Sequence, residues 1–288
     1  MSAAAFAIRD ARPAIRDYLE LSKSRIVLMV LITTAAGFLF AGSRDFVLLL
    51  NTLIGTALVA AGTNALNQYV EREYDARMRR TRLRPLPDGR IAPRTALLFA
   101  WTISAIGTIY LALAVNWLTA LLGALTLTSY IFVYTPLKRA SSLCTIVGAV
   151  PGAVPALMGW TAATGALGIG GWIAFAIVFL WQLPHFMAIS WMYREDYDRA
   201  GFVMLAVRDA EGKATARQAI LYSVALLALS MLPHVFGNAR LVAIAAAAVL
   251  VAMSIAFLMN RSSRTARRLF MTSNVYLLVA MVLLCLSS

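Results

Sequence analysis

Charged residues are scarce in this chain. Only 14% of its 288 residues are charged, whereas a soluble domain usually has about 25%. Hydrophobic residues make up 61%, and they form long apolar stretches separated by short charged segments. This composition excludes an ordinary soluble domain and predicts a polytopic integral membrane protein.

The sequence also lacks the usual marks of domain linkers. It has no Ser/Gly tract, no Pro-rich segment and no acidic tail. We therefore expect one membrane domain over residues 1–288, in which residues 1–25 precede the first apolar stretch. This first segment contains Asp17 and Glu20, whereas transit peptides are poor in acids, so we do not expect it to be one.

Cysteine and histidine are rare. The two cysteines, Cys144 and Cys285, form no Cys-x-x-Cys motif, so a disulfide or a cysteine metal site is not expected. The two histidines are His185 and His234. No Ser-His-Asp or Cys-His arrangement is recognisable, so nothing indicates a covalent nucleophile.

The formal net charge of +13 would suggest nucleic acid as a partner of a soluble protein. However, the sequence does not interleave aromatic and basic residues as single-strand binders do. Most arginines instead flank apolar stretches, where they determine membrane topology. The expected partner is the lipid bilayer, with no nucleic acid.

Seven stretches without Asp, Glu, Lys or Arg hold the candidate membrane spans. A membrane helix needs about 20 mostly apolar residues, so the two longest stretches hold two helices each. We therefore predict an all-α bundle of nine transmembrane helices. The stretches are 26–43, 46–70, 95–137 with a break near Asn116, 140–193 with a Gly-rich connection at 161–171, 218–239, 241–260 and 269–288.

Basic residues orient the nine spans. With the N-terminus inside, only Arg44 and Arg240 of the 26 Lys and Arg residues fall outside. Because cytoplasmic loops are rich in Lys and Arg, this split predicts a cytoplasmic N-terminus and an external C-terminus. All 13 acids except Asp45 fall on the cytoplasmic side, so the active site is expected there.

The first acidic cluster lies at the end of the second span. Asn67, Glu71 and Asp75 are four residues apart, so on a helix they share one face over about 12 Å. Their oxygen atoms suit Mg²⁺, which often binds one or two carboxylates together with substrate phosphates. Arginines follow in segment 78–85 and could bind those phosphates. The alternative is a solvated helix end with ion pairs.

The second acidic cluster, residues 193–201, ends the sixth span. The second and sixth spans both end at the cytoplasmic face, so the two clusters can meet. Lys138 and Arg139, after the fourth span, could contact a diphosphate or simply anchor the helix. A solvated loop remains the alternative for the second cluster.

His185 lies within an apolar stretch, eleven residues before Asp196. On one continuous helix these residues would share a face. An intramembrane histidine is a candidate for substrate contact, and the alternative is a hydrogen bond between helices. His234, near the outer face, is interpreted as structural.

These motifs resemble the UbiA superfamily of intramembrane prenyltransferases, and within it the protohaem IX farnesyltransferase (haem O synthase) branch. The resemblance covers nearly the whole chain from about Asp17. Two departures concern the acids: Glu71 stands where Asp is commoner, and Tyr193 and Tyr197 replace an Asp-x-x-x-Asp pair, as is typical of the branch. The motifs are Asn67-x-x-x-Glu71-x-x-x-Asp75, Arg80-Thr81-x-x-Arg84-Pro85, Tyr134-Thr135-x-x-Lys138-Arg139, Pro184-His185-Phe186, Asp196-Tyr197-x-Arg199-Ala200-Gly201 and Ala266-Arg267-Arg268-Leu269-Phe270.

The resemblance implies transfer of a farnesyl group from farnesyl diphosphate to a vinyl group of haem b, with addition of water, in a bacterial inner membrane. It implies Mg²⁺ as cofactor and haem A synthase as a partner. An aromatic or quinone acceptor, and a transporter, are the alternatives. The implied site residues are Asn67, Glu71, Asp75, Asp196, Tyr193 and Tyr197 for catalysis; Asn67, Glu71, Asp75 and Asp196 for the metal; Arg80, Arg84, Lys138, Arg139 and Arg25 for diphosphate; and His185 for haem.

Overall fold

A bundle of long apolar helices makes up the part of the chain that the structure describes. The computed structural model describes residues 13–287, except for the side chain of His234. No strand occurs in this range, so the all-α prediction is confirmed. The prediction for His234 lies outside what is described.

Eight helices are long and apolar enough to cross a membrane, and a bent pair of helices can supply a ninth span. The pair is α1 and α2, which meet at 57°. The bounds of all helical segments follow the order of the chain: α1 Ile15–Leu21, α2 Ser24–Phe40, α3 Phe46–Asp75, α4 Pro93–Ala114, α5 Trp117–Ser129, η1 Tyr130–Tyr134, α6 Thr135–Leu137, α7 Cys144–Thr164, α8 Ile169–Met192, α9 Arg194–Arg199, α10 Leu205–Arg208, α11 Lys213–Met231, α12 Pro233–Phe236, η2 Gly237–Ala239, α13 Arg240–Met259 and α14 Ser263–Leu286.

Local sequence explains where the long apolar stretches divide. Asn116 caps α5, because its side chain accepts a hydrogen bond of 2.8 Å from the Thr119 amide. Gly165 ends α7 with φ +72°, a left-handed conformation that glycine adopts without steric cost. Both predicted breaks are confirmed.

Small residues let the central helices approach closely. A methyl group on Gly37 of α2 would lie 1.9 Å from the carbonyl oxygen of Ala156 in α7. One on Gly159 of α7 would lie 1.9 Å from the carbonyl oxygen of Thr34 in α2. Since lipid gives no hydrophobic drive to helix association, such close packing is what holds membrane helices together.

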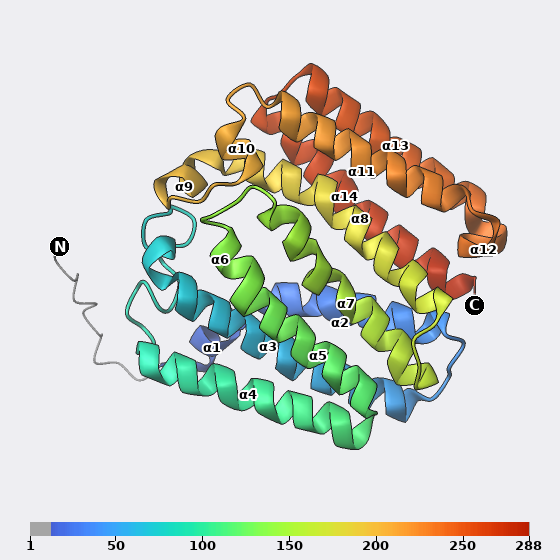
Figure 1. Cartoon of the computed structure of the whole chain (residues 1–288), viewed down its shortest axis with the longest axis horizontal. Coiled ribbons are helices and arrows are strands. Elements are labelled where there is room, and N and C mark those ends of the chain that lie inside the picture. The colour runs from blue at the N-terminus through green and yellow to red at the C-terminus, as the bar shows by residue number, and fades with distance from the viewer. Residues whose placement is uncertain (1–12, 288) are drawn as a thin grey trace.

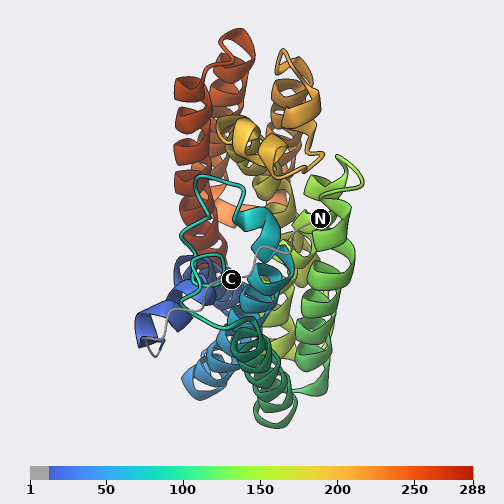
Figure 2. The ribbon, with the colours of Figure 1, turned by 90° about the vertical axis from the view of Figure 1, so that its left-hand side faces the viewer.

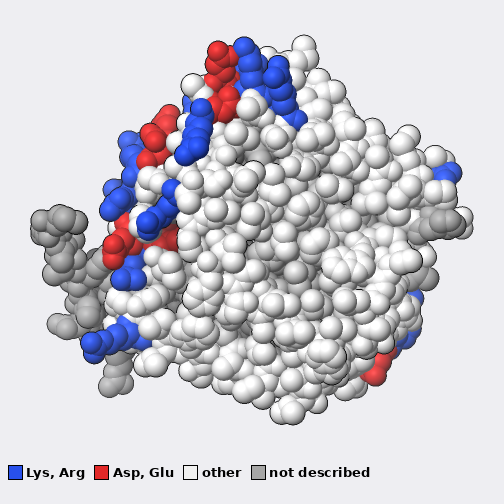
Figure 3. Space-filling view, in the orientation of Figure 1, with Lys and Arg blue, Asp and Glu red and all other residues white. Residues whose placement is uncertain are grey.

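Charged residues gather at one end of the bundle. In Figure 3 most of them lie along one edge and a few lie at the opposite edge, whereas the broad front face shows almost none. Figure 1 places α9, α10 and the loop after α3 at this end, and α12 with the C-terminus at the other. Figure 2 looks onto the charged end and shows the loop after α3 between α1 and α9.

A small apolar core ties the loops of the charged end together. Met78 from the loop after α3 packs with Cys144, Phe202 and Met204. Two hydrogen bonds reinforce it: the Val203 amide donates to the Lys138 carbonyl at 2.9 Å, and the Arg79 amide donates to the Asp196 carboxylate at 3.3 Å. Three loops far apart in sequence are therefore held as one unit.

Arg90 attaches α1 to the same end. Its guanidinium forms ion pairs with Asp17 and with Glu20, the latter at 2.9 Å, and with Asp88 at 3.0 Å. Burial lowers the pKa of Arg90, but Glu20 and Asp17 outweigh this and raise it above its usual value. Arg90 thus remains charged and fixes the short helix that precedes Lys23.

Candidate active site

The last turns of α3 place three polar side chains together. Asn67, Glu71 and Asp75 are buried, with exposed fractions of 1%, 5% and 0%. The four-residue spacing on one continuous helix accounts for their common face. Such burial contradicts the alternative of a solvated helix end, because buried acids need a partner charge or a metal.

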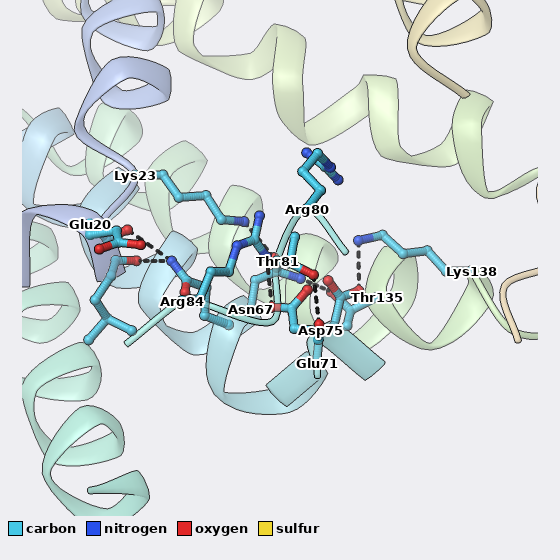
Figure 4. Close-up of polar contacts among 12 residues, drawn as sticks. Glu20, Lys23, Asn67, Glu71, Asp75, Arg80, Thr81, Arg84, Thr135 and Lys138 are labelled. Carbon is cyan, nitrogen blue, oxygen red and sulfur yellow. Dashed lines mark hydrogen bonds and ion pairs between the residues drawn. The ribbon is translucent and has the colours of Figure 1, made fainter. Parts of the chain in front are cut away.

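Each of these three side chains meets a cation from another segment. The Lys138 amine donates to Glu71 at 2.7 Å, and the Arg84 guanidinium donates to Asp75 at 2.7 Å. The Lys23 amine donates to the Asn67 side-chain oxygen at 2.8 Å. Figure 4 shows Lys23 and Arg84 approaching from one side and Lys138 from the other.

The backbone around the site is shaped by local hydrogen bonds. The Thr81 hydroxyl donates to the Asp75 carbonyl at 2.8 Å and closes the loop after α3. A π-helical turn, η1, precedes Lys138, and the Thr135 hydroxyl donates to the Tyr130 carbonyl at 2.8 Å. Asn67 in turn donates to Thr135 at 3.3 Å, which joins η1 to α3. π-Turns inside helices occur frequently at functional sites.

The two lysines differ in electrostatics. Burial lowers the pKa of Lys138, but the neighbouring Glu71 carboxylate outweighs it and holds the pKa well above its usual value. Burial of Lys23, in the turn between α1 and α2, together with the nearby Arg84 charge lowers its pKa to about 7. A further negative charge in this site would therefore favour the protonated form of Lys23.

Lys23 is the residue of this site that the sequence motifs did not single out. It adopts φ +51°, and among residues 13–287 it is the one non-glycine with positive φ. The backbone of a non-glycine residue is strained in the left-handed region, and such residues are typical of functional sites. In the sequence, Lys23 stands three residues before the first residue of the first apolar stretch, Ile26.

The second acidic cluster faces the loop after α3, as predicted. Asp196 is buried and accepts from Arg199 at 2.6 Å and from the Arg79 amide. The Arg80 guanidinium lies 5.0 Å from the Tyr193 ring centroid and 6.0 Å from that of Tyr197. The Arg80 guanidinium also reaches the Tyr197 hydroxyl at 3.5 Å.

Arg80 thereby differs from the other cations of the site. Arg84 and Lys138 are neutralised by carboxylates, whereas the contacts of Arg80 in the described range are with aromatic rings and a hydroxyl. A ring face attracts a guanidinium without cancelling its charge. Arg80 therefore keeps its full positive charge for an incoming anion.

Two other predicted diphosphate ligands, Arg139 and Arg25, lie outside the cluster formed by Asn67, Glu71 and Asp75. Arg139 stacks on Tyr74, with its guanidinium 5.0 Å from the ring centroid, and donates to the Tyr74 hydroxyl. Arg25 is exposed, and with Lys23 it lines a pocket of about 430 Å³ between α1 and α2. The structure gives neither arginine a contact with Asn67, Glu71 or Asp75.

His185 contacts α14 instead of the acidic clusters. Its Nδ1 lies 2.9 Å from the Ser273 hydroxyl, and its ring centroid lies 4.7 Å from that of Phe270. The expectation of one helix through His185 and Asp196 is wrong, because α8 ends at Met192 and Tyr193 is not helical. The shared-face argument therefore fails.

The oxygen atoms at the end of α3 fit a magnesium ion. One carboxylate oxygen of Asp75, Oδ1, is buried and has no hydrogen-bond partner in the described range. Asn67 and Glu71 add an amide and a carboxylate oxygen on the same helix face. Residues 13–287 contain no cluster of three or more His, Cys, Asp or Glu that could hold a metal, so phosphate oxygens would have to complete the coordination.

An apolar helix bundle with buried carboxylates and cations at one end has the architecture of a membrane-embedded enzyme. The sequence model of the UbiA prenyltransferase family matches residues 30–280, so the chain belongs to this family of transferases. This confirms the family resemblance of the motifs.

Several proteins similar to this chain are named protoheme IX farnesyltransferase. A protein of Solibacter usitatus named protoheme IX farnesyltransferase is 48% identical over 233 residues, which cover 77% of this chain and 80% of the relative. One of Koribacter versatilis with the same name is 39% identical over 91% of this chain and 90% of the relative.

Solved structures share the fold. A structure of digeranylgeranylglyceryl phosphate synthase matches with a TM-score of 0.77 and 18% identity, over 95% of this chain and 98% of that one. A UbiA homologue from Archaeoglobus fulgidus, bound to GPP and Mg²⁺, matches with a TM-score of 0.66 and 16% identity, over 93% and 99%. At these identities the likeness establishes the fold.

Proposed function

We propose that this protein transfers a farnesyl group from farnesyl diphosphate to a vinyl group of haem b, adding water and giving haem O and diphosphate. The acceptor rests on the relatives named protoheme IX farnesyltransferase, which align over most of this chain. The observation that carries the chemistry is the buried set Asn67, Glu71 and Asp75 facing Lys23, Arg84 and Lys138.

The reaction separates charge at one bond. The bond between farnesyl C1 and the diphosphate oxygen breaks, and its electron pair leaves with the diphosphate. C1 then bonds to a vinyl carbon, a water oxygen adds to the neighbouring carbon, and that water gives up one proton. Positive groups fixed around the leaving diphosphate stabilise the charge as it develops.

Different residues of the site would bind the diphosphate and the metal. Lys23, Arg84, Lys138 and Arg80 bind diphosphate oxygens from different sides. Asn67, Glu71 and Asp75 would hold Mg²⁺, which adds positive charge at the diphosphate when it is bound. A homologue of the same fold, from Archaeoglobus fulgidus, binds GPP and Mg²⁺, which supports a prenyl diphosphate and Mg²⁺ as the ligands.

The apolar bundle provides a dry environment for the farnesyl chain. An allylic cation is quenched by water, so exclusion of bulk water protects the transfer. His185, held by Ser273 and next to Phe270, is proposed to contact haem rather than diphosphate. A neutral imidazole can meet either the iron or the porphyrin edge.

The site is proposed to face the cytoplasm of a bacterium, in the inner membrane, with haem A synthase as a partner. The concentration of Lys and Arg in the segments predicted to lie inside supports this orientation. Reporter fusions at Gly165 should report the outer side, and those at Gly212 the inner side. The opposite pattern at both positions would reverse the orientation.

The function is tested by expressing the protein in cells that lack haem O and extracting their pigments. Haem O should accumulate with the wild type and be absent with Asp75→Asn expressed at an equal level. Purified protein with farnesyl diphosphate, haem b and Mg²⁺ should form the same product. Prenylation of an aromatic or quinone acceptor, without haem O, would contradict the proposal.

A further inference from the structure

A groove between α13 and α14 opens on the outside of the bundle, away from the residues assigned to catalysis. It has a volume of about 480 Å³. We call it the α13–α14 groove; it is lined by Met253, Arg264, Arg267, Arg268, Met271 and Thr272.

The groove is lined by basic residues near the start of α14 and by two methionines, Met253 and Met271. Its three arginines lie in the first two turns of α14, at the charged end of the bundle. Met253 lies six residues before the last residue of α13, or about 9 Å along that helix at 1.5 Å per residue. Beyond the groove the two helices continue with exposed Val249 and Val275.

The arginines of the groove have no acidic partner in the described range. All three are exposed, and none forms an ion pair there, whereas Arg84, Arg90 and Arg199 are each paired with a carboxylate. An arginine fork binds phosphate oxygens in bidentate fashion. Three guanidinium groups without an ion pair in the described range, next to an apolar helix surface, therefore complement a molecule with an anionic head and a hydrocarbon tail.

We propose that the α13–α14 groove binds one anionic phospholipid. Its phosphate would lie between Arg267 and Arg268, and an acyl chain would lie along Met253 and Met271. Basic pockets between membrane helices bind anionic head groups in this way. The methionines suit an acyl chain because their flexible side chains adapt to irregular apolar surfaces.

Lipid binding in the α13–α14 groove would also stabilise the helix that contacts His185. The same helix, α14, carries Phe270 and Ser273, which contact His185. A lipid that fixes the first turns of α14 should stabilise this helix and raise the thermal stability of the protein, because it binds the folded state alone. This inference is independent of the proposed acceptor and of the prenyl chain.

The test compares lipids on the purified full chain in detergent. Native mass spectrometry should show one phosphatidylglycerol bound roughly thirtyfold more tightly than phosphatidylcholine, since Arg267 and Arg268 should each add about 1 kcal/mol. Arg267→Gln with Arg268→Gln should abolish this preference and the rise in thermal midpoint that phosphatidylglycerol causes. Inorganic phosphate at millimolar concentration should not compete.

A matched control separates a site from general charge attraction. Lys213→Gln with Arg217→Gln removes two charges from the first turns of α11, another span that starts at the charged end. This control should keep the preference for phosphatidylglycerol. Equal loss in both pairs, an unchanged preference in the α14 pair, or displacement of the lipid by inorganic phosphate would overturn the proposal.

Haem binding should be measured as well, because haem, like an anionic phospholipid, combines negative charge with a large apolar surface. If the α14 pair weakened haem binding by spectral titration and left lipid preference intact, the groove would be a haem site and the lipid proposal would be wrong. Size exclusion and the thermal midpoint in the absence of lipid show whether each variant is folded. Haem O formation by the wild type tests the proposed function separately.

Discussion

Lys138 donates a hydrogen bond of 2.7 Å to Glu71, and the two residues, 67 positions apart, form a largely buried ion pair between α3 and the loop after α6. Arg84 and Asp75 form a second pair of the same length. The carboxylates proposed to bind Mg²⁺ are thus neutralised by cations proposed to bind diphosphate. A metal ion and a diphosphate would separate these pairs together.

This arrangement predicts coupled binding of metal and diphosphate. By isothermal titration, inorganic pyrophosphate should tighten Mg²⁺ binding by on the order of tenfold, within the usual range of coupling between sites. Lys138→Gln should tighten Mg²⁺ binding in the absence of pyrophosphate, because it leaves the Glu71 carboxylate without its partner, and should weaken pyrophosphate binding. Independent binding of the two ligands to the wild type would contradict the exchange of partners.

Asp75 is expected to be essential for turnover. Asp75→Asn keeps the shape of the side chain but removes the charge that faces Arg84 and the proposed metal. Haem O formation should fall about 10²-fold or more, as when a charge-stabilising contact is lost. The matched control is Glu73→Gln on the same helix, whose side chain is 61% exposed, and it should retain nearly full activity.

Two outcomes would contradict the proposed metal role of Asp75. Near wild-type turnover by Asp75→Asn, or turnover that persists in excess chelator, would remove the metal role of Asn67, Glu71 and Asp75. The thermal midpoint in detergent should be measured for both variants, because Arg84 loses its buried partner in one of them.

Tyr193 and Tyr197 are expected to act through Arg80. Phe at both positions keeps the ring faces and should preserve pyrophosphate affinity, whereas Leu at both should weaken it about fivefold, as loss of exposed cation–π contacts implies. Arg80→Ala should have little further effect in the Leu background. Fully additive losses would show that the tyrosines do not position Arg80, and Arg82→Ala, an exposed neighbour, is the control.

His185 is expected to affect haem and not diphosphate. Purified His185→Ala should bind haem more weakly in a spectral titration, while its affinity for farnesyl diphosphate stays nearly unchanged. Ser273→Ala removes the hydrogen-bond partner at 2.9 Å and keeps the imidazole, so it should have the smaller effect on haem. If only the thermal midpoint falls in His185→Ala, the histidine serves to join α8 to α14.

The sequence by itself determined the membrane-crossing elements and the face of α3. Apolar length locates the spans because a bilayer demands about 20 apolar residues, whatever their neighbours are. Periodicity places Asn67, Glu71 and Asp75 together because four residues are close to one helical turn, provided that the helix is continuous. That condition holds in α3 and fails at Tyr193, where α8 ends.

Only the tertiary structure decided which charges meet. Lys23 reaches Asn67 across 44 positions because α1 and α2 are bent at 57°, an angle that no local pattern specifies. Asp196 accepts a hydrogen bond from the Arg79 amide, 117 positions away, because a small apolar core brings their loops together. Hydrophobic packing is non-directional, so sequence pattern fixes which residues are buried but not which distant partners they meet.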